Sequence, residues 1–168
     1  MHRITDIASG KINGYAAVLV FLLALHILAA LFWVGGMAFA YWVLRPAAGP
    51  LEPAMRLPLW RRVFGIFLPW VGVSIAVLLG TGYAMLVLYF GGFASAPIYV
   101  NVMQGLGLLM VLLFLHLVFA PWRRLRAALD QGVLPEAAKY LNQIRVIVAI
   151  NLTLGIAAVV VGGTGRYW

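Results

Sequence analysis

Four long apolar stretches constrain what this chain can fold into. They cover about residues 15–44, 63–90, 98–121 and 144–164. About 20 consecutive apolar residues let a helix cross the hydrocarbon core of a bilayer, and none of the stretches shows the period-two alternation of membrane strands. Only 10% of the residues are charged, against about 25% in a soluble domain. The sequence therefore predicts an all-α integral membrane protein, a four-helix transmembrane bundle in which residues 1–168 form one domain.

The basic residues are distributed unevenly between the ends of these spans. The links 45–62 and 122–145 hold most of them: Arg45, Arg56, Arg61, Arg62, Arg123, Arg124, Arg126, Lys139 and Arg145. The opposite side holds only Arg3, Lys11 and Arg166. Because cytoplasmic loops are enriched in Lys and Arg, we expect a bacterial inner-membrane protein with both termini on the periplasmic side. Short basic links rather than one basic tract argue for the lipid bilayer, and against nucleic acid, as the partner.

Two prolines and a glycine predict local features of the helices. Pro69 lies inside the second span, where the missing backbone donor favours a kink. Gly132 is suited to end a helical extension of the third span, and Pro135 suits the first turn of the next helix. The link before the fourth span is therefore predicted to be partly helical.

Two histidines, His26 and His116, lie inside the first and third predicted spans. A charged imidazole is costly in hydrocarbon, so each is expected to be neutral and hydrogen-bonded, or bound to a metal. The four acidic residues lie outside the spans, which argues against a carboxylate proton relay: Asp6, Glu52, Asp130 and Glu136. The chain has no cysteine, which excludes thiolate metal sites. The two histidines are therefore the first candidates for ligating haem iron or copper.

The surroundings of both histidines suit a planar cofactor. Trp33 follows His26 by seven residues on the same helix face, and Gly105 leaves room eleven residues before His116. The leading hypothesis is a haem b ligated by both histidines, with an electron-transfer or redox role. A membrane oxidoreductase is compatible with it, and candidate partners are a quinone, a porphyrin, a redox protein or a second copy of the chain.

The depths of the two histidines leave the number of sites open. His26 lies 11 residues from the outer end of its span and His116 lies 18, a difference of roughly 10 Å at 1.5 Å per residue. One shared haem and two separate sites both remain open. Asn151 is predicted to orient His116, Thr81 to orient His26, and Arg145 at the inner rim to bind a propionate.

The methionines support a second hypothesis. Met85 and Met103 are predicted near the outer ends of their helices, with Met110 close to the depth of His26. Thioether and imidazole ligands together suit Cu(I). A copper-transport or copper-resistance protein is therefore the alternative to a haem protein. In a third hypothesis the chain is a non-catalytic scaffold whose histidines only form hydrogen bonds within the bundle.

The residues His26, Trp33 and Gly36 resemble the first-helix pattern of the CopD-type (copper resistance D) membrane domain. They are also similar to the related HemJ-type protoporphyrinogen oxidase proteins, as is His116 followed by a basic helix exit. The resemblance implies a small four-helix membrane protein tied to b-type haem or to copper, and makes Gly36 a candidate cofactor-binding residue. HemJ-type proteins are expected to carry an intramembrane lysine, and no predicted span here contains one, which argues against protoporphyrinogen oxidation.

Overall fold

Four helices long and apolar enough to cross a membrane make up the protein. A computed structural model describes residues 2–167, and their side chains from Gly14 onward. The four candidate spans are Gly14–Ala47, Pro53–Phe90, Ile98–Asp130 and Leu134–Tyr167. Large apolar side chains cover the outside of the bundle, and Ile66, for example, is 70% exposed. This exposure is expected where lipid replaces water as the solvent, so the prediction of an all-α membrane bundle is confirmed.

The first span consists of α1 (His2–Phe39), a π-helical turn (Ala40–Leu44) and the short α2 (Arg45–Ala47). The second is the single helix α3 (Pro53–Phe90). The third consists of α4 (Ile98–Leu117), a second π-helical turn (Val118–Trp122) and α5 (Arg123–Asp130). The fourth is α6 (Leu134–Thr164), followed by a 3₁₀ turn (Gly165–Tyr167).

The link between α5 and α6 has the predicted form. Gly132 follows α5 with a φ of 72°, a left-handed conformation that glycine adopts without strain. A proline stands in the first turn of α6, where its missing N–H is not needed. The partly helical link predicted from Gly132 and Pro135 is therefore confirmed.

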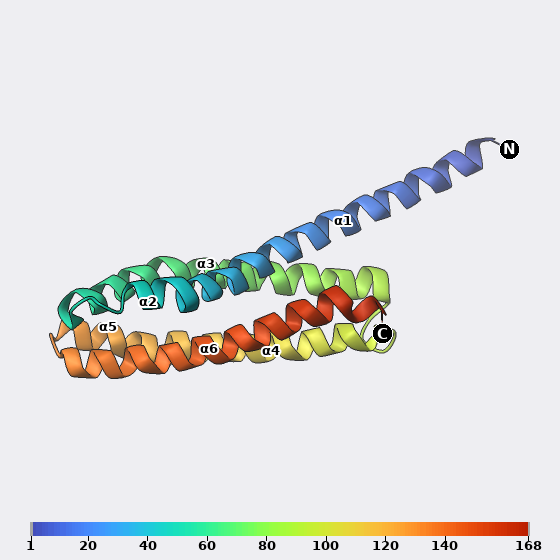
Figure 1. Cartoon of the computed structure of the whole chain (residues 1–168). Helices are drawn as coiled ribbons and strands as arrows, with labels where there is room; N and C mark the ends of the chain where they lie inside the picture. Colours follow the sequence, from blue (N-terminus) through green and yellow to red (C-terminus); the bar gives the residue numbers. More distant parts are fainter. Residues whose placement is uncertain (1, 168) are drawn as a thin grey trace.

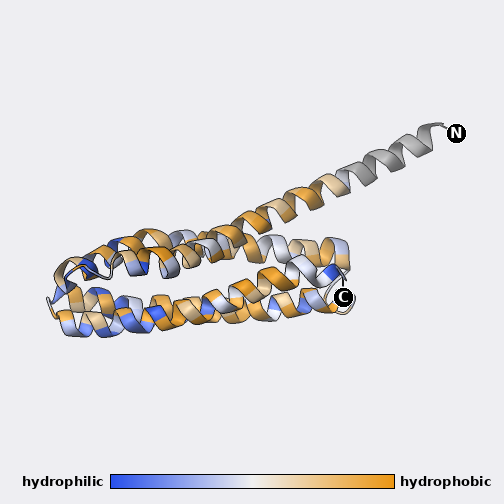
Figure 2. Cartoon of the chain, viewed as in Figure 1, coloured by the Kyte–Doolittle hydropathy of each residue, from blue (hydrophilic) through white to orange (hydrophobic). Residues whose placement is uncertain are grey.

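The helices pack mainly as two pairs. α1 lies against α3 and α4 lies against α6, while α6 also contacts both members of the first pair (Figure 1). The links that carry most of the basic residues meet at one end of the bundle, which we call the basic end. Hydrophilic residues are concentrated there, around α2 and α5 (Figure 2). The end formed by the 91–97 loop is called the neutral end.

Two clusters of buried apolar residues hold the bundle together, and neither reaches the neutral end. The basic-end cluster joins α3, α4, α5 and α6, and includes Leu57, Trp60, Phe64, Leu117, Trp122, Leu125, Leu141 and Ile144. The central cluster consists of Trp33, Met37, Val71, Ile75, Met110 and Leu152. At the neutral end Leu86 and Ala29 are buried, but they lie outside both clusters. The packing is therefore strongest at the basic end and in the centre.

Polar contacts also connect the helices at the neutral end. The Gln104 amide donates a hydrogen bond to the Tyr83 hydroxyl at 3.2 Å and thereby joins α4 to α3. The Tyr89 hydroxyl donates to the backbone oxygen of Tyr15 at 2.6 Å and joins α3 to α1. Both contacts lie on the neutral-end side of the level at which His26 meets Thr81 of α3.

Candidate metal site at His26

His26 lies half-buried on α1, with its imidazole against α3. Nδ1 of the ring lies 2.9 Å from the Thr81 hydroxyl oxygen. A Cβ built onto Gly82 would lie 3.3 Å from Cε1 of the ring, so the missing side chain of this glycine lets the imidazole sit close to α3. The sequence indicated Thr81 as a partner of His26, and the structure confirms the contact. That Gly82 faces His26 was not predicted, because only helix pairing places the two residues opposite each other.

The hydrogen bonds of Thr81 determine which nitrogen of His26 carries the proton. The Thr81 hydroxyl donates its single hydrogen to the backbone oxygen of Val77 at 2.7 Å. With the hydroxyl hydrogen assigned to this shorter bond, the Thr81 oxygen accepts from the ring and Nδ1 of His26 is the donor. A neutral imidazole has only one N–H, so Nε2 carries a free lone pair. Nε2 of His26 can therefore act as an electron-pair donor where α1 packs against α3.

His116 lies elsewhere in the molecule. Its side chain is exposed on α4 and forms no hydrogen bond with the described part of the chain. The next residue, Leu117, lines a cavity together with Leu68 of α3, whereas His26 contacts Thr81 of the same helix. Thirteen residues of α3 separate these two levels, which is roughly 20 Å along the helix.

The structure therefore does not bring the two histidines together. The separation is about twice the depth difference of roughly 10 Å expected from the sequence. One haem ligated by both His26 and His116 finds no support in this arrangement. Among the described residues there is also no group of three or more His, Cys, Asp or Glu side chains that could hold a metal ion.

The remaining predicted cofactor residues are divided between different environments. Trp33 is buried in the central cluster, with its ring 6.3 Å from that of Phe114. The space beside Gly36 is filled by the Phe67 ring, and Gly105 lies on the exposed surface of α4. Arg145 lies at the basic end, far from the level of His26.

The methionines differ in their distance from His26. Met85 is half-buried on α3, four residues beyond Thr81 and on the same helix face, about 6 Å farther along the axis. Met103 packs its thioether on α6, since a Cβ at Gly162 would lie 3.0 Å from its sulfur. Met110 is buried in the central cluster with Trp33, seven residues deeper than His26, and so does not share its depth. Met85 and Met103 are therefore the methionines nearest the level of His26.

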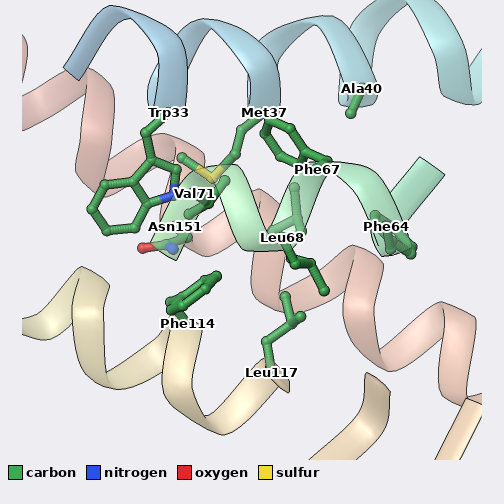
Figure 3. A pocket seen from close by; sticks show the side chains of 11 residues that line it. Trp33, Met37, Ala40, Phe64, Phe67, Leu68, Val71, Phe114, Leu117 and Asn151 are labelled. Carbon is green, nitrogen blue, oxygen red and sulfur yellow. The ribbon is translucent and has the colours of Figure 1, made fainter. Parts of the chain in front are cut away.

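Asn151 lines a cavity of about 20 Å³ in the centre of the bundle, a space large enough for one water molecule (Figure 3). Its side chain is 3% exposed, and its Nδ2 donates to the backbone oxygen of Met110 at 3.4 Å. Its Oδ1 is buried without a hydrogen-bond partner in the described residues. Trp33, Met37 and Phe114 face the same space. Asn151 therefore does not contact His116, which lies on the outer surface.

Comparison with known proteins identifies the family. The family model for copper resistance protein D, CopD, matches residues 61–164. This protein belongs to the CopD family. The match covers most of α3 and continues through α4, α5 and α6, so it includes Thr81, Met85 and Met103 but not His26. Searches of curated proteins and of solved structures gave no match to this CopD-family chain.

Proposed function

We propose that this CopD-family protein handles copper within the membrane, with Nε2 of His26 as the first protein ligand. The observation that carries the proposal is the orientation of the His26 ring by Thr81. Histidines that bind metals usually donate their other ring N–H to a fixed acceptor, which sets the tautomer and the direction of the free lone pair. Thr81 is such an acceptor, because its own hydrogen is used by Val77.

Met85 is the best candidate for a second ligand. It follows Thr81 by one helical turn, so its side chain leaves α3 on the side that faces His26. Met103 lies at a similar level on α4, next to the Gln104 that bonds to Tyr83. Imidazole and thioether donors form a soft ligand set that suits Cu(I), and copper is then the cargo of the protein.

The distribution of charge supports an orientation for this site. Both basic links lie at one end of the bundle, and the positive-inside rule places that end in the cytoplasm. The neutral end, with His26, Met85 and Met103, then lies toward the periplasmic side of a bacterial inner membrane. Copper from outside the cell would thus meet His26 before it meets the packed centre of the bundle.

Measurement of Cu(I) affinity in detergent, by competition with a chromophoric chelator, tests the proposal. We expect His26→Gln to abolish binding of the high-affinity equivalent. Thr81→Val should weaken binding by about 10-fold to 100-fold, the usual effect of removing the acceptor behind a metal-binding histidine. Thr81→Ser, which keeps the hydroxyl, should retain most of the affinity.

His116→Gln is the matched control, since it removes the other intramembrane histidine from an exposed position. It should leave the affinity unchanged. Equal losses in His26→Gln and His116→Gln would contradict a site at His26. An unchanged affinity in His26→Gln would contradict it as well.

A further inference from the structure

A pocket at the basic end is bordered by residues that carry hydrogen-bond donors. It lies between the end of the first span, α3 and α6, and its lining includes Tyr41, Arg45, Trp60 and Arg145. Arg45 is exposed and its guanidinium lies 5.0 Å from the centre of the Tyr41 ring. Arg145 and Trp60 lie deeper. We call this site the basic pocket.

Several donors in and beside the basic pocket lack an acceptor. Trp60 is only 3% exposed, and its indole N–H is buried without a hydrogen-bond partner among the described residues. The Nε atoms of Arg145 and Arg56 are also buried without a hydrogen-bond partner among the described residues. A buried donor without a partner is costly, and such groups are normally satisfied by protein, water or ligand. Two such donors in the lining of the pocket, and a third on Arg56 beside it, indicate an acceptor that comes from outside the chain.

The charges of the site require a negative partner. Arg45 and Arg145 line the same pocket, and Arg56 donates a hydrogen bond to the backbone oxygen of Gly49, four residues beyond Arg45. Within the part of the chain that the structure describes, the ion pair at this end joins Arg61 to Asp130 at 2.5 Å and leaves these three arginines without a carboxylate. Like charges held together without a counterion are destabilising. An anion in the basic pocket would remove this repulsion.

We propose that the arginines around the mouth of the basic pocket bind the phosphate group of an anionic phospholipid. A phosphate supplies several acceptor oxygens and at least one negative charge, which matches the buried indole N–H and the unpaired guanidiniums. Basic pockets between membrane helices are suited to anionic lipid headgroups. The neighbouring Trp42 is 59% exposed on the outside of the bundle, so acyl chains of a lipid bound here would lie against an apolar surface. The inference does not depend on copper binding.

Lipid titration followed by native mass spectrometry tests the inference on the full-length protein in neutral detergent. The wild-type protein is expected to retain phosphatidylglycerol at least 10-fold more tightly than phosphatidylcholine. Arg145→Gln and the exposed Arg45→Gln should each weaken retention of phosphatidylglycerol by about 10-fold, as expected for loss of a charged hydrogen bond. Trp60→Phe keeps the ring and removes only the N–H, and should weaken it severalfold.

Arg124→Gln is the matched control, because Arg124 is an exposed arginine at the same end and does not line the pocket. It should change retention by less than twofold. A loss in Arg124→Gln as large as that in Arg145→Gln would show that only the overall charge matters, and would overturn the inference. Equal retention of the two lipids by the wild-type protein would overturn it too.

A second arm identifies the source of the phosphate. Inorganic phosphate at millimolar concentration is added to lipid-free protein, and the thermal unfolding midpoint is compared with that obtained with phosphatidylglycerol. Stabilisation by the lipid alone assigns the site to a membrane headgroup. Stabilisation by inorganic phosphate that Arg145→Gln abolishes overturns the assignment to a lipid and leaves a site for a soluble phosphate compound.

Discussion

Replacing Gly36 with alanine is expected to force α1 away from α3, because Gly36 lies against the Phe67 ring. A Cβ at this position would lie 2.4 Å from Cε2 and 2.6 Å from Cζ of the Phe67 ring. Real Cβ atoms do not come so near an aromatic carbon. The ring also packs against Phe32, with centroids 5.9 Å apart, so it has little freedom to turn away.

Gly35→Ala is the reference substitution against which the loss of stability in Gly36→Ala is estimated. A Cβ there would meet only Cδ1 of Leu31, at 4.0 Å, which is an ordinary contact. Both substitutions gain about the same helix propensity, roughly 1 kcal/mol in favour of alanine. Overpacking a well-filled contact costs about 1–3 kcal/mol. Gly36→Ala is therefore expected to be about 1–3 kcal/mol less stable than Gly35→Ala.

The free energy of unfolding in mixed micelles, followed by tryptophan fluorescence, measures this difference. Phe67→Leu removes the obstructing ring atoms, so the cost of Gly36→Ala should fall to near zero in the Phe67→Leu background. Such non-additivity would show that the loss of stability in Gly36→Ala comes from its contact with the Phe67 ring. Equal stabilities of Gly35→Ala and Gly36→Ala, or additive effects of Gly36→Ala and Phe67→Leu, would refute the reasoning.

Two further predictions concern the central cavity and the orientation. Asn151→Leu removes a buried acceptor without a partner, and should raise the free energy of unfolding by about 1 kcal/mol in the same assay; a loss of stability would show that Oδ1 has a bound partner. Because the chain has no cysteine, single cysteines at Ser95 and Gln131 report topology. A membrane-impermeant maleimide added to intact cells should label Ser95→Cys and not Gln131→Cys, and the reverse result would contradict the proposed orientation.

The sequence contained the information that determines the spans, because apolar length alone decides which segments enter a bilayer. It predicted their ends less well at the basic side. α3 begins at Pro53, ten residues before the expected start, since the segment with Arg56, Arg61 and Arg62 buries Leu57 and Trp60 in the basic-end cluster. The arginines on one face of this segment made it look like a link in the sequence, although its other face packs in the basic-end cluster.

The candidate site could be predicted only in part. Thr81 was identified as a partner of His26 because its depth could be counted along a helix. The position of His116 could not be predicted in this way, since the rotation of α4 about its axis depends on the residues of α6 against which it packs. The basic pocket was missed because Arg145 and Trp60 are 85 positions apart in the sequence, and only the meeting of α3 and α6 brings them together.

The restriction of both apolar clusters to the basic end and the centre has a consequence for how the protein moves. Separation of the helices at the neutral end breaks hydrogen bonds such as those of Tyr83 and Thr81 but leaves both apolar clusters intact. Regions with few buried contacts open at a small fraction of the global unfolding free energy. His26 therefore lies in the part of the bundle that can open most easily, while the opposite half remains closed and keeps the membrane sealed.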